Sequence, residues 1–230
     1  RDTAEVLKGL DLEQSRTKLL AIVANKRGAK DAAAFEEIRY LGYPFSISET
    51  FQLRNTNATI EESLERVEVI QEICKSANKE MVIYISMGFG NPYGDAWNVE
   101  IVQKWVDRLV GMDIGILQLS DTIGVSNPES IEYLFSNLLP AYPDVEIGAH
   151  LHTAPHNWKE KIHAAYESGC RRFDGAIKGY GGCPMAKDEL TGNMPMENMI
   201  HYFDEIGLDM GMNQQAFQKA MKMAVEVFPL

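Results

Sequence analysis

The sequence has few cysteines, no surplus of positive charge and no long apolar segment. Its three cysteines cannot all pair with one another, so a disulfide framework is not indicated. The formal net charge of −11 argues against a nucleic-acid partner, because phosphate binding depends on surfaces rich in Lys and Arg. With no signal peptide and no apolar run of membrane-spanning length, we expect a cytoplasmic protein that does not use a membrane.

The chain also lacks low-complexity stretches and linkers rich in Pro, Gly or Ser. At 230 residues, with 45% hydrophobic content, it is long enough for one sizeable core and short for two. Acidic and basic residues are mixed along the chain, which is typical of an ordinary protein surface. We therefore expect residues 1–230 to form a single domain.

Short apolar runs alternate with longer amphipathic segments along the chain. The runs are rich in β-branched and aromatic residues and are bounded by Gly, Asn, Asp or Pro, so they predict strands. Strands are expected at 18–24, 38–48, 81–87, 114–119, 145–152 and 171–177. Helices are expected at 2–10, 31–37, 60–77, 98–111, 128–139, 158–168, 196–206 and 214–227.

This order of strands and helices predicts a parallel sheet, either open and doubly wound or closed into a barrel. Polar residues follow the ends of several strands, as a barrel site requires. An open sheet would instead gather its chemistry at one switch point, usually with a glycine-rich phosphate turn after the first strand, and no GxGxxG lies there. The sequence therefore predicts an α/β fold of the TIM (β/α)8-barrel type, with six of the eight strands in this chain.

Two histidines separated by one residue, His150 and His152, end the fifth expected strand. Residues two apart on a strand point to the same side, so both imidazoles are expected to project together. Such a pair can supply two nitrogen ligands to one metal ion. The alternative is that both make ordinary hydrogen bonds at a strand end, because short motifs often match by chance.

A glycine-rich segment with a cysteine, Gly179-Tyr180-Gly181-Gly182-Cys183-Pro184, follows the last expected strand. Glycines let the backbone approach a ligand closely, and a free thiol on such a turn is placed for proton transfer or nucleophilic attack. The alternative is a tight turn with a small buried thiol, and that interpretation suits Cys74 and Cys170.

Three further polar residues lie beyond the ends of expected strands. Asn193 offers a neutral oxygen that suits a hard divalent ion such as Mg²⁺ or Mn²⁺. Asp121 could act as a base, orient another residue or simply begin a loop, and Glu49 follows an early strand. Taken singly, each is more often structural, because Asp and Asn are common turn residues.

Together, these segments resemble the hydroxymethylglutaryl-CoA lyase family, within the wider superfamily of barrel metallo-lyases, over residues 18–208. The matching segments are SISETFQLRNTNATIEES (46–63), YISMGFGNPYG (84–94), LSDTIGVSNP (119–128), GAHLH (148–152) and GYGGCPMA…TGNMPMENM (179–199). The histidine pair also suits related synthases, whereas GGCP followed by GN points to the lyase branch.

The resemblance implies a role for each matched residue. His150, His152 and Asn193 would bind Mg²⁺ or Mn²⁺, and His150 would also do acid–base work. Cys183 would lie on a mobile loop that closes over the substrate and would act in proton transfer. The other matched residues would belong to the substrate site: Asp121, which would also take part in catalysis, Glu49, Thr122 and Ser86.

The resemblance further implies an enzyme that cleaves 3-hydroxy-3-methylglutaryl-CoA to acetyl-CoA and acetoacetate. The expected partners are an acyl-CoA substrate and a second copy of the chain in a homodimer. Two alternatives stay open. One is a related synthase or lyase acting on a similar acyl-CoA, and the other is a non-catalytic binding or assembly subunit.

The sequence departs from the family pattern in three places. Family members carry an Arg–Asp pair at the end of the first barrel strand, whereas Arg1-Asp2 begins a helical segment here. The residue after the second histidine is commonly Asp and is Thr153 here, and the spacing from Cys183 to Asn193 is slightly longer. We therefore expect two further barrel strands, with an Arg–Asp pair, upstream of residue 1.

Overall fold

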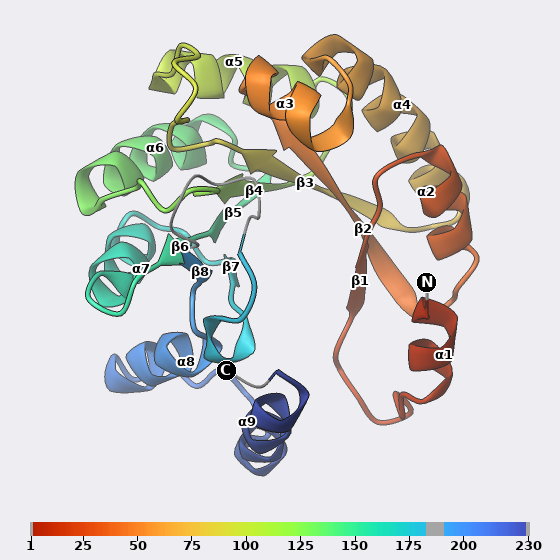
Figure 1. The fold of residues 1–230 in the computed structure, drawn as a ribbon, viewed down its shortest axis with the longest axis vertical. Coiled ribbons are helices and arrows are strands. Elements are labelled where there is room, and N and C mark those ends of the chain that lie inside the picture. The colour runs from red at the N-terminus through yellow and green to blue at the C-terminus, as the bar shows by residue number, and fades with distance from the viewer. Residues whose placement is uncertain (1, 183–190, 229–230) are drawn as a thin grey trace.

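Six parallel strands form one curled sheet, with helices around its outer face (Figure 1). The structure is a computed structural model, and it describes residues 2–182 and 191–228. The strands are β1 Leu19–Ile22, β2 Ile38–Ser46, β3 Glu80–Ser86, β4 Ile116–Ser120, β5 Glu146–His150 and β7 Phe173–Asp174. Their order in the sheet is β1-β2-β3-β4-β5-β7, and every neighbouring pair is parallel. The predicted barrel-type sheet, with six strands in this chain, is confirmed.

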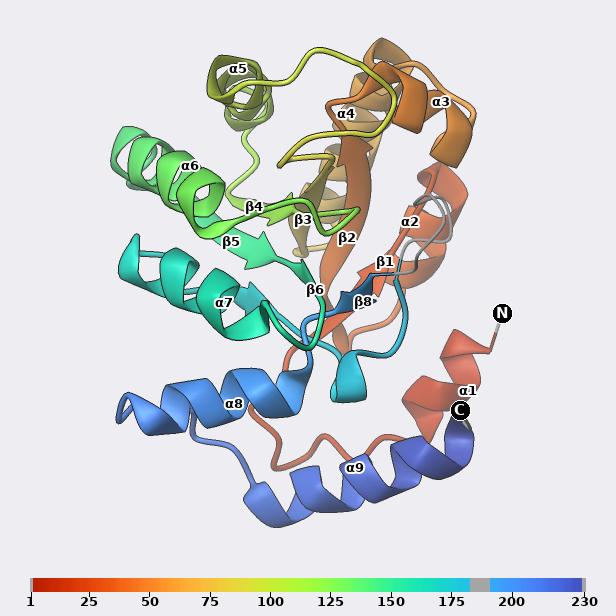
Figure 2. The same ribbon diagram turned by 60° about the vertical axis from the view of Figure 1, so that its left-hand side comes forward.

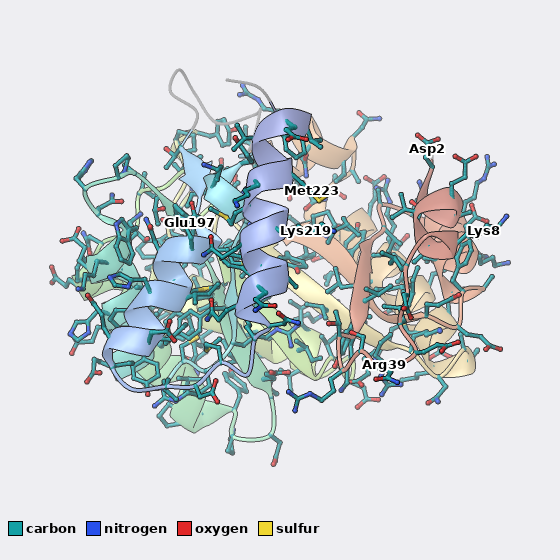
Figure 3. All side chains as sticks on the ribbon, turned by 90° about the horizontal axis from the view of Figure 1, so that it is seen from below. Asp2, Lys8, Arg39, Glu197, Lys219 and Met223 are labelled. Carbon is teal, nitrogen blue, oxygen red and sulfur yellow. The ribbon has the colours of Figure 1, made fainter. Side chains whose placement is uncertain are left out.

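At least one helix connects each strand to the next, and helices cover the outer face of the sheet in both views (Figures 1 and 2). The helices are α1 Thr3–Lys8, α2 Lys26–Ala33, α3 Glu49–Thr56, α4 Ile60–Ser76, α5 Val99–Val110, α6 Pro128–Ala141, α7 Trp158–Glu167, α8 Met196–Glu205 and α9 Gln214–Val227, with a short 3-10 turn η1 at Ile177–Gly179. Seen from below, α9 crosses the molecule, and Asp2 and Lys8 project outward beside α1 (Figure 3). In the part of the chain that is described, no helix has the length and apolar character needed to cross a membrane.

Side-chain caps explain where several helices begin. Thr59 and Glu62 form a reciprocal capping box at the start of α4, in which each side chain binds the backbone N–H of the other. Asn127 caps α6 ahead of Pro128, whose fixed φ and missing N–H suit the first helical position. Asn25 accepts a hydrogen bond from the Gly28 N–H and so starts α2.

The structure differs from the local predictions in several places. The helix predicted at 31–37 is α2, which begins earlier because Asn25 caps it, and α3 was not predicted at all. The strand predicted at 145–152 ends at His150, and the next two residues, β6 His152–Thr153, pair antiparallel with β8 Gly192–Asn193. The strand ends at His150 because the next residues pair with a segment about 40 residues further along the chain, and a local sequence pattern cannot predict such a partner.

Alternation along the strands separates the core from the interior of the curled sheet. Phe45 and Ile83 are fully buried, and the Phe45 ring packs edge-on against Trp105 of α5 at 5.6 Å between centroids. The residues next to them in sequence point to the opposite face of the sheet. Tyr84 and Ser86 on that face line the cavity described below. The apolar core therefore lies between sheet and helices, and the concave side carries the polar and apolar side chains that line the cavity.

Candidate functional site

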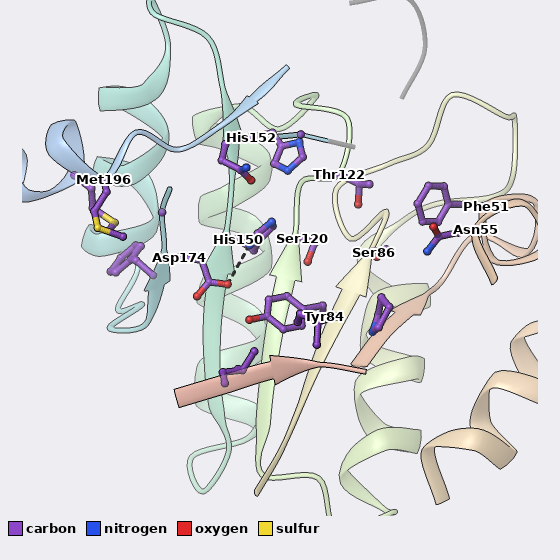
Figure 4. A pocket seen from close by; sticks show the side chains of 18 residues that line it. Phe51, Asn55, Tyr84, Ser86, Ser120, Thr122, His150, His152, Asp174 and Met196 are labelled. Atoms are coloured by element: carbon purple, nitrogen blue, oxygen red, sulfur yellow. Dashed lines mark hydrogen bonds and ion pairs between the residues drawn. The ribbon is translucent and has the colours of Figure 1, made fainter. Parts of the chain in front are cut away.

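A cavity of about 620 Å³ lies at the C-terminal ends of the parallel strands (Figure 4). Its polar wall includes Ser86, Ser120, His150 and Asp174, the last residues of β3, β4, β5 and β7. Parallel strands all end at one edge, so residues far apart in sequence gather there. The register is direct, because Ser120 pairs with His150 and His150 pairs with Asp174. Apolar side chains complete the wall: Leu20, Ile22, Phe51, Phe173, Met196 and Met199.

Both histidines of the predicted pair line this cavity. The ring centroids of His150 and His152 are 5.5 Å apart. Leu151 between them is 3% exposed and joins the hydrophobic core, as alternation along an extended chain requires. The prediction that the two rings project to one side is confirmed.

His150 is held by two side chains of the cavity wall. Its Nδ1 lies 3.0 Å from Oδ2 of Asp174 on β7. Next to Asp174, the Tyr84 ring of β3 meets the imidazole edge-on, with centroids 5.6 Å apart and planes at 88° (Figure 4). These contacts fix the plane of the imidazole at the mouth of the sheet.

His152 is more deeply buried and less well supported. The residue is 4% exposed, and its Nδ1 is buried without a hydrogen-bond partner among the described residues. Burial, assisted by the nearby His150 ring, lowers the pKa of His152 to about 4. The imidazole is therefore neutral at pH 7, which is the form that can bind a metal ion.

Asn193 reaches the same cavity through the ribbon of β6 and β8. It pairs directly with His152 across the ribbon, and its Nδ2 donates a 2.8 Å hydrogen bond to the Tyr180 carbonyl oxygen. A Cβ at Gly181 would come within 2.9 Å of this Nδ2, so the backbone at Gly181, with φ +91°, passes where only glycine fits. The amide orientation leaves Oδ1 for a ligand.

The donor atoms at this end of the cavity suit a divalent ion. His150 and His152 offer imidazole nitrogens, and Asn193 offers an amide oxygen. The unpartnered Nδ1 of His152 is a buried polar atom of the kind that a missing ligand would explain. Within the described ranges there is no group of three His, Cys, Asp or Glu side chains arranged for a metal, so this mixed set is what those residues provide.

Comparison with known proteins agrees with this geometry. The HMGL-like family matches residues 3–224. The chain belongs to the HMGL-like family. Hydroxymethylglutaryl-CoA lyase YngG of Bacillus subtilis is 30% identical over 226 residues, which cover 98% of this chain and 75% of that protein. The cytoplasmic 3-hydroxy-3-methylglutaryl-CoA lyase of Homo sapiens is 30% identical over 214 residues, which cover 92% of this chain and 56% of that protein.

Solved structures of HMG-CoA lyases superpose closely on this HMGL-like chain. The Bacillus subtilis HMG-CoA lyase has a TM-score of 0.90 at 29% identity, covering 99% of this chain and 75% of that one. An Acinetobacter baumannii HMG-CoA lyase, determined with coenzyme A and 3-methylmalate, has a TM-score of 0.88 at 25% identity, covering 99% and 73%. The resemblance stated from the sequence motifs is confirmed.

Ser86 and Thr122, predicted to bind substrate in the HMGL-like site, both line the cavity. Thr122 Oγ1 accepts a 2.8 Å hydrogen bond from the Met87 N–H, which fixes the side chain and leaves its O–H free to donate. Met87 has a φ of +60°, so this bond stabilises a left-handed backbone at the end of β3.

Asp121 and Glu49 are not brought to the cavity wall. Asp121 is 1% exposed, and its carboxylate accepts hydrogen bonds from the Ser126 N–H at 3.1 Å and the Ser126 Oγ at 2.5 Å. Lys161 Nζ lies 2.8 Å from its Oδ2. Glu49 is exposed, and its Oε2 accepts from the Ile60 N–H at 3.2 Å, at the start of α4. Both carboxylates hold neighbouring main chain, and the site roles that the resemblance implies for them stay predictions.

Cys183 lies outside the described residues, so its predicted role stays a prediction. The other two cysteines are buried, and burial raises the pKa of Cys74 to about 11 and of Cys170 to about 12. Neither would form a thiolate at neutral pH. Their expected structural role is consistent with this.

Sequence reasoning missed three residues of this HMGL-like site: Tyr84, Asp174 and Lys161. Tyr84 stands two residues before Ser86 on the same strand face, and Asp174 ends β7 as His150 ends β5, so strand-end position could have found both. Lys161 carried no such signal, because a lysine on an amphipathic helix usually faces solvent. Its side chain is 1% exposed here.

Proposed function

We propose that this protein cleaves 3-hydroxy-3-methylglutaryl-CoA to acetyl-CoA and acetoacetate with the help of a divalent metal ion. The observation that carries the proposal is the pair of imidazoles 5.5 Å apart, joined by Asn193, at the C-terminal edge of a parallel barrel-type sheet. Similarity to HMG-CoA lyases over nearly the whole chain supports it.

His150, His152 and Asn193 would hold the ion, as either Mg²⁺ or Mn²⁺. When bound, the ion would make the C3 hydroxyl of the substrate more acidic by withdrawing charge from it. His152 suits the purely ligating position, because it is buried and neutral. The role of Asn193 is supported by its pairing with His152 and by the hydrogen bond that orients its amide.

The C3 hydroxyl would lose its proton to a water molecule or buffer base, because neither nitrogen of His150 is left to accept it. Its Nδ1 is engaged by Asp174 and its Nε2 would hold the ion, so in this proposal His150 is a ligand and not the base that the resemblance implied. Loss of that proton lets the C3 oxygen become the ketone of acetoacetate as the C2–C3 bond breaks. The bonding electrons pass to the enolate of acetyl-CoA, which then takes a proton at carbon.

The enolate needs hydrogen-bond donors and a proton source. Thr122 would be one such donor, because its O–H can donate while its Oγ1 accepts a hydrogen bond from the backbone. Ser86 lies on the same wall and carries a second hydroxyl group. Cys183 would supply the proton, as the family resemblance implies. The buried apolar side chains of Phe51 and Met199 on the wall would help to exclude water from the reacting carbons.

The remaining expectations about partners and location are proposals as well. The acyl-CoA substrate is supported by the Acinetobacter baumannii HMG-CoA lyase, whose structure is a complex with coenzyme A. The homodimer and the cytoplasmic location stay predictions from the sequence. Light scattering of the purified protein would test the first, and localisation of the tagged protein would test the second.

The direct test is incubation of the protein with 3-hydroxy-3-methylglutaryl-CoA and Mg²⁺ or Mn²⁺. We expect acetyl-CoA and acetoacetate in equal amounts by mass spectrometry, and loss of both on chelation. His152→Ala should abolish the products, whereas His156→Ala, an exposed histidine four residues on, should not change them. The proposal is overturned if no cleavage occurs, or if the protein instead condenses acetyl-CoA with a 2-keto acid.

A further inference from the structure

The two histidines of the site differ in how their rings are held. His150 Nδ1 lies 3.0 Å from a carboxylate oxygen of Asp174, whereas His152 Nδ1 has no hydrogen-bond partner among the described residues. Asp174 and His150 are direct partners in the β5–β7 register, so their side chains leave the sheet on one side. The contact follows from the sheet itself and needs no loop to adjust.

A carboxylate that accepts a hydrogen bond from a histidine selects one tautomer of the ring. An ionised carboxyl group can only accept, so the hydrogen must lie on Nδ1 of His150. Nε2 then carries the lone pair. The opposite tautomer would place the Nδ1 lone pair against the Asp174 oxygen 3.0 Å away and would lose the bond.

Asp174 is itself kept in place by Tyr84. The Tyr84 phenol makes a hydrogen bond with the Asp174 side chain, and its O–H is the donor because an ionised carboxylate only accepts. The Tyr84 ring also packs edge-on to His150 at 5.6 Å. Three neighbouring side chains, from β3, β5 and β7, therefore brace one another on the cavity wall (Figure 4).

We infer that Asp174 is a positioning residue that sets the tautomer and ring plane of His150, so that Nε2 is ready to bind the metal ion. A ligand histidine held by a carboxylate binds metal more tightly, and loss of such a partner typically costs ~10–100-fold in affinity. Tyr84 acts one step further back, by holding Asp174. This inference rests on the proposed function in one respect, namely that a divalent ion binds at His150.

The first test reads the tautomer in the metal-free protein. The chain has five histidines, so long-range nitrogen–proton NMR correlations of ¹⁵N-histidine-labelled protein can be assigned with a His150→Gln variant. We expect the hydrogen of His150 on Nδ1 at pH 8. In Asp174→Ala, the His150 ring should become a mixture of tautomers dominated by the Nε2–H form. In Asp174→Asn, the Nδ1–H form should again dominate, because the amide oxygen can still accept the hydrogen bond. A hydrogen on Nε2 in the unmodified protein would overturn the inference.

The second test measures Mn²⁺ binding by electron paramagnetic resonance. Asp174→Ala should weaken binding ~10–100-fold, whereas Tyr84→Phe keeps the carboxylate and should weaken it far less. Circular dichroism spectra matching the unmodified protein would show that the variants are folded. Equal Mn²⁺ affinity in Asp174→Ala and the unmodified protein would overturn the inference. Neither measurement uses the lyase reaction. If both gave the expected results while the cleavage assay failed, the proposed function would be wrong and the role of Asp174 would still hold.

Discussion

Replacing Lys161 with Met should destabilise this protein far more than replacing an exposed lysine. The Lys161 side chain is 1% exposed, and its Nζ donates to Asp121 Oδ2 at 2.8 Å, the His152 carbonyl at 2.9 Å and the Gly124 carbonyl at 3.1 Å. It therefore ties the loop after β4 to the second histidine of the site. Met has similar length and bulk, so the substitution removes the charge and the donors while keeping the packing.

The expected loss in the free energy of unfolding is ~3–5 kcal/mol, because removing one partner leaves a buried charge uncompensated. Asp121 retains both hydrogen bonds from Ser126, which favours the lower end of that range. The double variant Asp121→Asn with Lys161→Met also removes the buried carboxylate charge. Its loss in the free energy of unfolding should fall to ~1–3 kcal/mol, the order expected when buried carbonyl groups are left without a donor.

Urea unfolding followed by circular dichroism would measure these differences. Lys159→Met is a matched control two residues earlier on the same helix, whose lysine forms an exposed pair with Glu205 at 2.6 Å. That pair should contribute no more than ~1 kcal/mol. The reasoning is refuted if Lys161→Met unfolds within ~1 kcal/mol of the unmodified protein, or if the double variant is no more stable than the single one.

Three further outcomes are expected. The free energy of unfolding should fall by up to ~3 kcal/mol as the pH drops from about 6.5 to about 4, because this histidine becomes protonated in the unfolded chain while His152 in the folded protein stays neutral. Urea unfolding at several pH values should show this decrease, and His152→Asn should remove it. Gly148→Ala should lower the free energy of unfolding by ~1–3 kcal/mol in the same assay, because the new Cβ would lie 1.7 Å from Gln118 Oε1. Adding Gln118→Ala should recover part of that stability. If nothing is recovered, the clash with Gln118 is not the cause. Cys183→Ala should lower turnover ~10²–10⁴-fold with Mn²⁺ affinity unchanged; full turnover would make the thiol structural.

Local rules predicted much of the fold from the sequence. Each strand of the six-stranded sheet was found within a few residues, because β-branched runs bounded by turn residues report their own structure, whereas the short strand β8 was not predicted. The side-by-side rings of His150 and His152 follow from two-residue alternation, which needs no knowledge of the fold. The start of α2 was misplaced, since the Asn25 cap outweighs the amphipathic pattern that begins later.

The sequence by itself thus determined the barrel class, the strand ends and the histidine pair, all of which depend on short-range periodicity and motif spacing. Only the tertiary structure decided which groups support that pair. Asp174 reaches His150 through the β5–β7 register, and Asn193 reaches His152 across the β6–β8 ribbon. Lys161, on an amphipathic helix where lysines usually face solvent, is buried and pairs with the Asp121 carboxylate. Burial and pairing partners depend on how distant segments pack, and no local pattern in a single chain encodes that.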